Sequence, residues 1–169
     1  DRPQNISTHD FMTLRSRLKS NALALAEMTG KIENNLSVVL LLAWRGNRLL
    51  FTGDAEWDAA YQGAVKPGRC NGAWNVMWAE RKDQLSVPMD FLKVGHHGSN
   101  TSSSLSFIRA VSPQFGIVSV GKDNRYNHPS SYVLQRYRSL GCRVLRTDRS
   151  GAVYFKSDGK RLERVRWRK

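Results

Sequence analysis

Two stretches near the start of the chain carry apolar patterns that predict secondary structure directly. Residues 9–29 follow good N-cap residues and place apolar side chains close to a helical face, which predicts a leading helix within residues 1–33. Residues 36–44 are dense in apolar side chains and too short for a membrane span, which predicts a strand buried on both faces. A polar turn then leads to a return strand at 49–52, completing a hairpin.

Downstream of this hairpin, apolar strands alternate with helical segments bounded by Gly, Pro or Ser. Residues 60–88 hold an insert rich in Gly and Trp whose structure the pattern does not predict. The alternation indicates a single α/β domain over residues 1–169, with a mixed sheet covered by helices. The predicted elements are a short helix at 56–61, strands at 90–95 and 115–120, helices at 104–111 and 130–140, a hairpin of 143–146 with 152–155, and an edge strand from Leu162.

Composition agrees with a globular domain. The chain has 169 residues, 40% of them apolar, which can supply a substantial core. Its longest apolar run, Val38 to Trp44, predicts no membrane segment, so we expect a soluble protein and favour the cytoplasm. Two cysteines, Cys70 and Cys142, are too few for a disulfide framework and are expected to be reduced, structural thiols.

The chain is strongly basic, with a net charge of +13. Residues 122–169 contain 14 Lys and Arg against 4 Asp and Glu, and the basic tail at 160–169 alternates basic with apolar positions. Such a field concentrates polyanions, which indicates nucleic acid or another phosphate-rich partner. The alternative is that a basic terminal strand only presents a solvated face to water.

Three polar loops each follow a predicted strand, at residues 52–54, 95–99 and 121–129. Loops that leave the same ends of sheet strands can converge on one crevice. A carboxylate and several imidazoles would then meet, a ligand set that suits zinc, manganese or iron. Each element also has a structural interpretation: T-G-D as a capped turn and His128-Pro129 as an ordinary loop. The pentad G-H-H-G-S at a strand end is harder to explain that way.

Five segments in this order carry a resemblance to a known family: N-N-L-S-V-V-L-L-L (34–42), L-L-F-T-G-D (49–54), F-L-K-V-G-H-H-G-S (91–99), V-S-V-G-K-D-N-R-Y-N-H-P (118–129) and V-L-R-T-D-R-S-G-A-V (144–153). Together they resemble the C-terminal half of a metallo-β-lactamase-fold hydrolase. Within that superfamily the chain is most similar to the ComEC-like branch, the hydrolase domain found in DNA-uptake proteins and in free-standing relatives. The insert at 60–88 lies outside the similarity.

The resemblance implies an αββα sandwich with a site for two divalent metal ions, zinc in the first place and manganese as the alternative. Carried onto this chain, it makes Asp54 the bridging carboxylate and His97 a ligand of the second metal, with His96 either a further ligand or a substrate contact. Asn127 stands where the family has glycine, which puts the geometry of that loop in question. The implied catalytic residues are His96, Lys122 and His128, and the implied substrate-binding residues are Ser99, Asn124 and Arg125.

One part of the family pattern is absent. The signature H-x-H-x-D-H does not occur, and the only further histidine is His9, in an unrelated context. Asp54 with one or two histidines cannot complete a tetrahedral metal shell. Because the sequence also begins at Asp1 rather than Met, we expect the N-terminal half of the fold to come from another segment of the parent polypeptide or from a second chain. A half fold alone would expose a broad apolar sheet face.

The first functional hypothesis is therefore a metal-dependent hydrolase, a phosphodiesterase or nuclease that uses a hydroxide activated by two metal ions. A bridging carboxylate and a basic surface favour phosphate over a lactam. The alternative is a catalytically inactive module that binds nucleic acid or a partner, with Trp57, Trp74, Trp78 and Trp167 stacking bases if they are exposed and packing in the core otherwise. Hydrolysis of a thioester, lactone or lactam is a third hypothesis, because one fold hosts many reactions.

Overall fold

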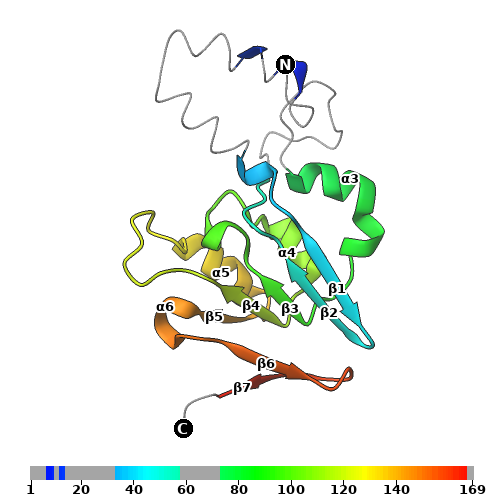
Figure 1. The fold of residues 1–169 in the computed structure, drawn as a ribbon, viewed down its shortest axis with the longest axis vertical. Coiled ribbons are helices and arrows are strands. Elements are labelled where there is room, and N and C mark those ends of the chain that lie inside the picture. The colour runs from blue at the N-terminus through cyan, green and yellow to red at the C-terminus, as the bar shows by residue number, and fades with distance from the viewer. Residues whose placement is uncertain (1–6, 10–11, 14–32, 58–72, 167–169) are drawn as a thin grey trace.

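The computed structural model describes residues 7–9, 12–13, 33–57 and 73–166 (Figure 1). Most of the predicted leading helix and of the predicted helix at 56–61 lies outside these residues, as do Cys70 and Trp167. Within the described ranges, no helix has the length and apolar character needed to cross a membrane.

Five strands form one mixed sheet in the order β1-β2-β3-β4-β5 (Figure 1). β1 and β2 pair antiparallel, with Arg45 and Gly46 between them, whereas β2 to β5 run parallel to one another. The predicted first hairpin and the α/β class are thereby confirmed. The strands are β1 Leu40–Trp44, β2 Asn47–Phe51, β3 Phe91–Lys93, β4 Phe115–Val118 and β5 Arg143–Arg146.

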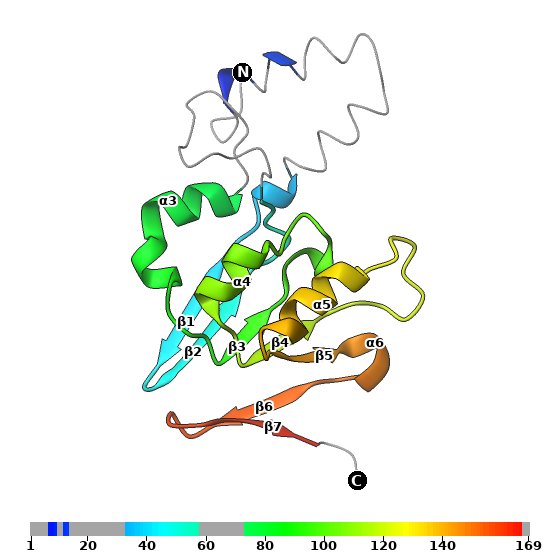
Figure 2. The ribbon, with the colours of Figure 1, turned by 180° about the vertical axis from the view of Figure 1, so that it is seen from behind.

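Helices cover one face of this sheet. α4 (Leu105–Val111) and α5 (Ser131–Ser139) lie in front of the strands in Figure 2, which confirms the helices predicted around 104–111 and 130–140. The hydroxyl of Ser104 caps α4 by accepting a hydrogen bond from the Phe107 amide at 3.2 Å. Parallel strands joined by such crossovers place their carboxyl ends along one edge of the sheet, where loops are free to carry chemistry.

The core lies between the sheet and these helices. Leu50, Leu92 and Val118 project from the strands toward Phe107, Ile108, Val133 and Tyr137, and all are buried. α3 (Ala73–Leu85), which falls within residues 60–88, also joins this core. The fully buried Trp74 ring lies 4.4 Å from the Phe107 ring, and its Nε1 donates to the Ala55 carbonyl at 3.1 Å. Trp57 and Trp78 are partly buried and pack against the same cluster, which favours a packing role over stacking bases.

The prediction that residues 36–44 form a strand buried on both faces is wrong. The strand begins at Leu40 and is an edge strand of the sheet. Val39 and Leu41 pack against the core, whereas the alternate side chains lie on the opposite face of the sheet and are exposed. We call these exposed residues, Val38, Leu40, Leu42 and Trp44, the apolar stripe.

The predicted hairpin of 143–146 with 152–155 is also wrong. β5 pairs only with β4 in the main sheet, and the following residues form a short helix, α6 (Thr147–Ser150). The Thr147 hydroxyl donates to the Val120 carbonyl at 2.8 Å and accepts from the Val120 amide at 2.8 Å, which ties α6 to the end of β4 and turns the chain away. The chain then forms a separate hairpin of β6 (Tyr154–Ser157) with β7 (Leu162–Val165), so the strand predicted from Leu162 is confirmed.

The β6–β7 hairpin meets the sheet face opposite the helices through one aromatic side chain. The Phe155 ring lies 5.4 Å from Phe91 and 5.0 Å from Phe115, in edge-to-face arrangements. Phe91 in turn lies 5.2 Å from Phe51, which is paired across the strands with Leu40 of the apolar stripe. The apolar stripe therefore continues an aromatic surface that the hairpin covers only in part.

Candidate functional site

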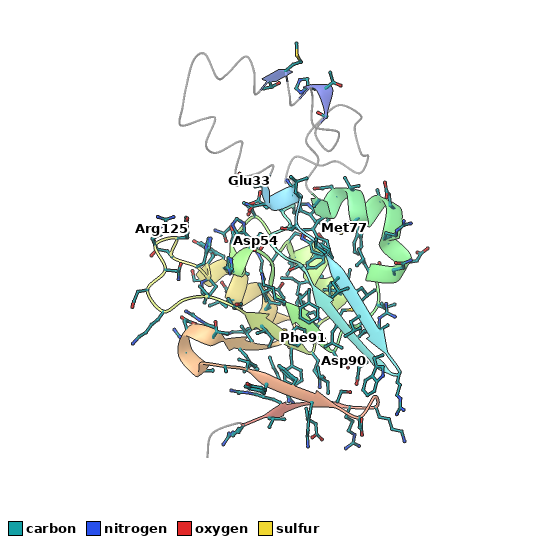
Figure 3. The ribbon with its side chains drawn as sticks, viewed as in Figure 1. Glu33, Asp54, Met77, Asp90, Phe91 and Arg125 are labelled. Carbon is teal, nitrogen blue, oxygen red and sulfur yellow. The ribbon has the colours of Figure 1, made fainter. Side chains whose placement is uncertain are left out.

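The three loops predicted to carry chemistry converge at one edge of the sheet. Residues 52–54 follow β2, the 3-10 turn Gly95–Gly98 follows β3, and residues 119–130 follow β4. Asp54 Oδ2 lies 3.6 Å from His97 Nε2, and the rings of His96 and His128 are 5.5 Å apart. Figure 3 shows Asp54 at one end of the sheet and Asp90 at the other. Because β2, β3 and β4 are parallel, side chains separated by 74 residues meet here.

The paired histidines have an unusual backbone. His96 and His97 have φ angles of +43° and +52°, a left-handed conformation that costs roughly 1–2 kcal/mol for each residue with a Cβ. Hydrogen bonds hold the turn: the His96 amide donates to the Gly53 carbonyl at 3.0 Å, and the Ser102 hydroxyl donates to the Gly95 carbonyl at 2.7 Å. Backbone strain that the surroundings maintain is typical of functional sites.

The ring of His97 is fixed with one nitrogen toward Asp54. Its Nδ1 lies 2.6 Å from the Ser119 carbonyl oxygen, which can only accept, so Nδ1 carries the proton. In the neutral imidazole, Nε2 is then the unprotonated nitrogen and faces a carboxylate oxygen of Asp54, so that two acceptors lie 3.6 Å apart. A cation between them would satisfy both. Metal-binding histidines commonly donate their second ring nitrogen in this way, so this pair fits a divalent metal.

Lys93, which was not among the predicted site residues, lies beside Asp54. Its ammonium is 3.6 Å from Asp54 Oδ1 and donates to the Gly53 carbonyl at 3.1 Å. Burial lowers the pKa of Lys93, and the Asp54 carboxylate opposes that shift. The amide of Asp54 donates to the Ser37 hydroxyl at 2.9 Å. Lys93 therefore contacts the carboxylate while Ser37 holds the backbone of Asp54, and about a third of the Asp54 side chain stays exposed.

The loop that carries His128 is braced by its own side chains. Asn124 accepts from the His128 amide at 2.9 Å and donates to the His128 carbonyl at 2.7 Å, so its amide group is engaged within the loop rather than free for substrate. Asn127 has φ +55° and so retains the left-handed conformation that glycine would adopt. Burial lowers the pKa of His128, with the neighbouring His96 and His97 adding to the shift and Asp54 opposing it.

The other predicted site residues lie around this cluster. Ser99 is buried, and its hydroxyl bonds to that of Thr101 at 3.0 Å. Arg125 is exposed on the loop, where its guanidinium lies 5.0 Å from the Tyr126 ring, and that ring stacks on His128. Lys122 is exposed on the same loop, and within the described ranges no ion pair of its side chain joins it to the cluster.

A buried carboxylate that the predictions missed lies under His96. Glu56 is 7% exposed, and its Oε1 lies 3.0 Å from His96 Nδ1. Burial raises the pKa of Glu56, but interactions with His96, Thr101 and Asn34 together outweigh burial and bring this pKa below its ordinary value. The sequence offers one local feature at this position: a second acidic residue two positions after Asp54, in T-G-D-A-E.

In the part of the chain that the structure describes, no group of three or more Asp, Glu, His or Cys side chains converges as a complete metal shell. The donors that point at one another are Asp54 and His97. A cavity of about 480 Å³ lies instead at the other end of the strands, lined by residues such as Gln114, Phe115 and Arg143. We place the chemistry at the converging loops, because that cavity brings no potential metal ligand next to an imidazole.

No family model matches the chain. Over 124 residues, 73% of its length, it is 36% identical to ComE operon protein 3 of Bacillus subtilis, and over 123 residues, also 73%, it is 37% identical to competence protein ComA of Neisseria gonorrhoeae. Over 133 residues, 79% of its length, it is 31% identical to recombination protein 2 of Haemophilus influenzae. The chain is homologous to one segment of each of these proteins. The resemblance to the ComEC-like branch is thereby confirmed as homology, while the metallo-β-lactamase fold stays a prediction.

The match covers a small share of each relative. The chain spans 14% of ComE operon protein 3, 16% of competence protein ComA and 14% of recombination protein 2. The similarity therefore relates this chain to one region of much longer proteins.

Proposed function

We propose that the chain forms one half of a metal-dependent hydrolase site that cleaves phosphodiester bonds in nucleic acid, within a protein that has a role in competence and DNA uptake. The observation that carries the proposal is the facing pair of acceptors, Asp54 Oδ2 and His97 Nε2, with the other His97 nitrogen engaged by a backbone carbonyl. The competence name of one homologue supports the biological setting.

Asp54 and His97 would hold a divalent metal, zinc or manganese, and His96 is available as a further ligand. When bound, two such ions would supply Lewis acidity that activates water toward a phosphorus atom. The residues of this chain hold the geometry: the Ser119 carbonyl sets the His97 tautomer, and Lys93 and Ser37 restrain Asp54. A carboxylate in this place is a hard metal ligand, which favours phosphate chemistry more than a cysteine thiolate in the same place would.

His128 is suited to act on the leaving oxygen. Because burial and two neighbouring imidazoles keep its pKa low, the ring is neutral at physiological pH and can donate one hydrogen bond without a full charge. Arg125 and Lys122 on the same loop supply positive charge next to it, consistent with the net charge of +13. A phosphodiester held at this edge would therefore meet cationic groups on the side of the leaving group.

The remaining ligands would come from the N-terminal half of an αββα sandwich, in the same polypeptide or in a second chain. The apolar stripe supports this proposal, since Leu40 and Leu42 are each about half exposed on the sheet face that the helices leave open. Contiguous exposed apolar side chains of this kind usually mark an interface. The short share of each relative that the chain spans is consistent with further segments beside it.

The test is metal-dependent hydrolysis by the complete protein. Asp54→Ala and His97→Ala should each lower kcat for bis-p-nitrophenyl phosphate and for single-stranded DNA by at least a hundredfold, as expected when a metal ligand is lost. Asp123→Ala, which removes an exposed carboxylate of the nearby loop, is the matched control and should retain activity. Unchanged turnover in Asp54→Ala would refute the proposal, as would activity that survives exhaustive removal of metal.

One observation favours the binding-only alternative, namely that the described residues bring together fewer than three metal-ligating side chains. Metal content separates the two hypotheses. The enzyme predicts two equivalents of zinc or manganese in the complete protein, and the binding module predicts none after purification with metal present.

A further inference from the structure

Glu56 is the most deeply buried acidic side chain near the converging loops, and side chains from separate segments fix its position. Thr101 Oγ1 donates to Glu56 Oε1 at 2.9 Å, and Asn34 Nδ2 donates to the same oxygen at 3.2 Å. The backbone is held as well, because the Glu56 amide donates to Asn35 Oδ1 at 3.3 Å. The carboxylate thus has a defined location before any ligand arrives.

His96 depends on this carboxylate for its ring orientation. Its Nδ1 atom is buried, and within the described ranges its one close acceptor is Glu56 Oε1, at 3.0 Å but outside the angles of an ideal hydrogen bond. A lone pair on Nδ1 would face a negative oxygen in a place that water does not reach. Such an arrangement is unfavourable, so the proton is expected on Nδ1.

We propose that Glu56 is a positioning residue that keeps the proton of His96 on Nδ1, so that Nε2 is the ring nitrogen presented to the site. The inference rests on the proposed function for its purpose, since His96 would then act as a metal ligand or substrate contact through Nε2. His97 reaches the same orientation by a different route, with Nδ1 on a backbone carbonyl. The two adjacent imidazoles therefore present the same nitrogen, one set by the main chain and the other by a side chain.

The contacts of Glu56 indicate a role for a buried carboxylate at this position. An anion in a buried position is costly unless several donors stabilise it, and here Asn34 and Thr101 donate to one oxygen while His96 Nδ1 lies 3.0 Å from it. A purely structural link between residues 34 and 101 could be made by a neutral side chain. A carboxylate oxygen holds the imidazole in one tautomer, as any acceptor in its place would, and its charge also makes the imidazole a stronger ligand.

The experiment uses two-bond ¹H–¹⁵N correlation spectra of the metal-free, full 169-residue chain at pH 8, with His96 assigned by comparison with His96→Gln. Wild-type protein should show His96 with its proton on Nδ1. Glu56→Ala should shift His96 toward the Nε2-protonated form or a mixture, and Glu56→Gln, whose amide oxygen can take the same place, should restore the Nδ1-protonated form. Thr101→Val is the matched control: it removes a hydrogen bond from Glu56 without touching His96, and it should leave the tautomer unchanged.

In the complete protein, Glu56→Ala should lower kcat by 10- to 100-fold, as is typical for residues that orient a metal ligand, and Thr101→Val by less than threefold. Three results would overturn the inference: an Nε2-protonated His96 in the wild type, an unchanged tautomer in Glu56→Ala, or an equal change in Thr101→Val. Should Glu56→Ala fail to fold, the wild-type spectrum decides. The spectra involve no metal or substrate, so they can reject this role of Glu56 while the Asp54→Ala result still stands.

Discussion

Gly98 is the position where the histidine turn touches the loop of His128, and its substitution tests how the site is assembled. The residue has φ +86°, and a Cβ added there would lie 2.5 Å from Pro129 Cβ and 3.1 Å from Pro129 Cα. The second contact is with backbone, so no side-chain rotation relieves it. Gly98→Ala must therefore either push the His128 loop away or change the backbone of the histidine turn.

The expected loss in the free energy of unfolding has two parts, and substitutions at other glycines of this chain distinguish them. A left-handed φ costs a residue with a Cβ roughly 1–2 kcal/mol, and overpacking adds about 1–3 kcal/mol. Gly141 has φ +79° with no heavy atom within 4 Å of an added Cβ, so Gly141→Ala measures the first part alone. Gly121→Ala has neither feature and should change the free energy of unfolding by about 0.5 kcal/mol or less. Gly98→Ala should lose roughly 2–5 kcal/mol.

The assay is urea unfolding of the three variants and the wild type, monitored by tryptophan fluorescence. The free energies of unfolding are compared between proteins whose m-values agree. The same variants should be assayed for phosphodiester hydrolysis in the complete protein, where Gly98→Ala alone is expected to lose activity because the His128 loop moves. If Gly98→Ala is no more destabilising than Gly141→Ala, the close approach to Pro129 does not constrain the site, and the assembly described here is wrong.

Two further predictions concern groups outside the site. The Arg146 guanidinium holds the pKa of Asp148 below its ordinary value of 3.8, so this carboxylate contributes stability that is present above pH 3.8 and is lost as the pH falls below it. Asp148→Asn should therefore flatten the fall in melting temperature between about pH 4 and pH 2, and an unchanged slope would contradict this. Burial raises the pKa of the Cys142 thiol to about 12, so iodoacetamide at pH 8 should label Cys142 only after unfolding, as peptide mass mapping can verify; rapid labelling of the native chain would contradict the burial.

Much of the fold was predictable because local signals and tertiary packing agree. The helix predicted at 104–111 begins with a serine, and Ser104 caps α4 in the structure; the apolar run at Phe115–Val118 is an interior strand buried at every position. The convergence of the loops was also predictable, since parallel strands bring their carboxyl ends together whatever lies between them. Asp54 and His97 meet for that reason, although they lie 43 positions apart in the sequence.

The wrong predictions concern segments whose apolar composition does not show which other elements pack against them. Residues 36–44 have the composition of a central strand, yet β1 lies at the edge and only Val39 and Leu41 face the core. Likewise, the turn at 147–150 resembles a hairpin connection, but pairing with β4 and the Thr147 bonds to Val120 commit β5 to the main sheet. Partner choice between strands is a tertiary property that a local pattern does not encode.

Glu56 was missed for a related reason. A single Glu in a loop carries no periodic signal, and its importance comes from contacts with residues that are distant in sequence, Asn34, His96 and Thr101. The motif T-G-D drew attention to the first carboxylate only. A buried acid beside a predicted metal ligand is a useful search criterion, because the imidazole that it orients cannot orient itself.

The apolar stripe and the proposed metal site lie on the same side of the molecule. The apolar stripe runs along β1 to Val38, and a Cβ built on Gly53 would lie 3.2 Å from the Val38 carbonyl, so the stripe ends beside the loop of Asp54. At that same loop, the part of the chain that the structure describes brings together fewer than three candidate metal ligands. One partner element packed on the stripe would reach the Asp54 edge and could bring its own ligands there, burying the apolar face in the same step. Leu42→Lys, which is expected to leave the helix-side core intact, should then weaken both partner association and metal retention. If both are unchanged, the apolar stripe does not support the metal site.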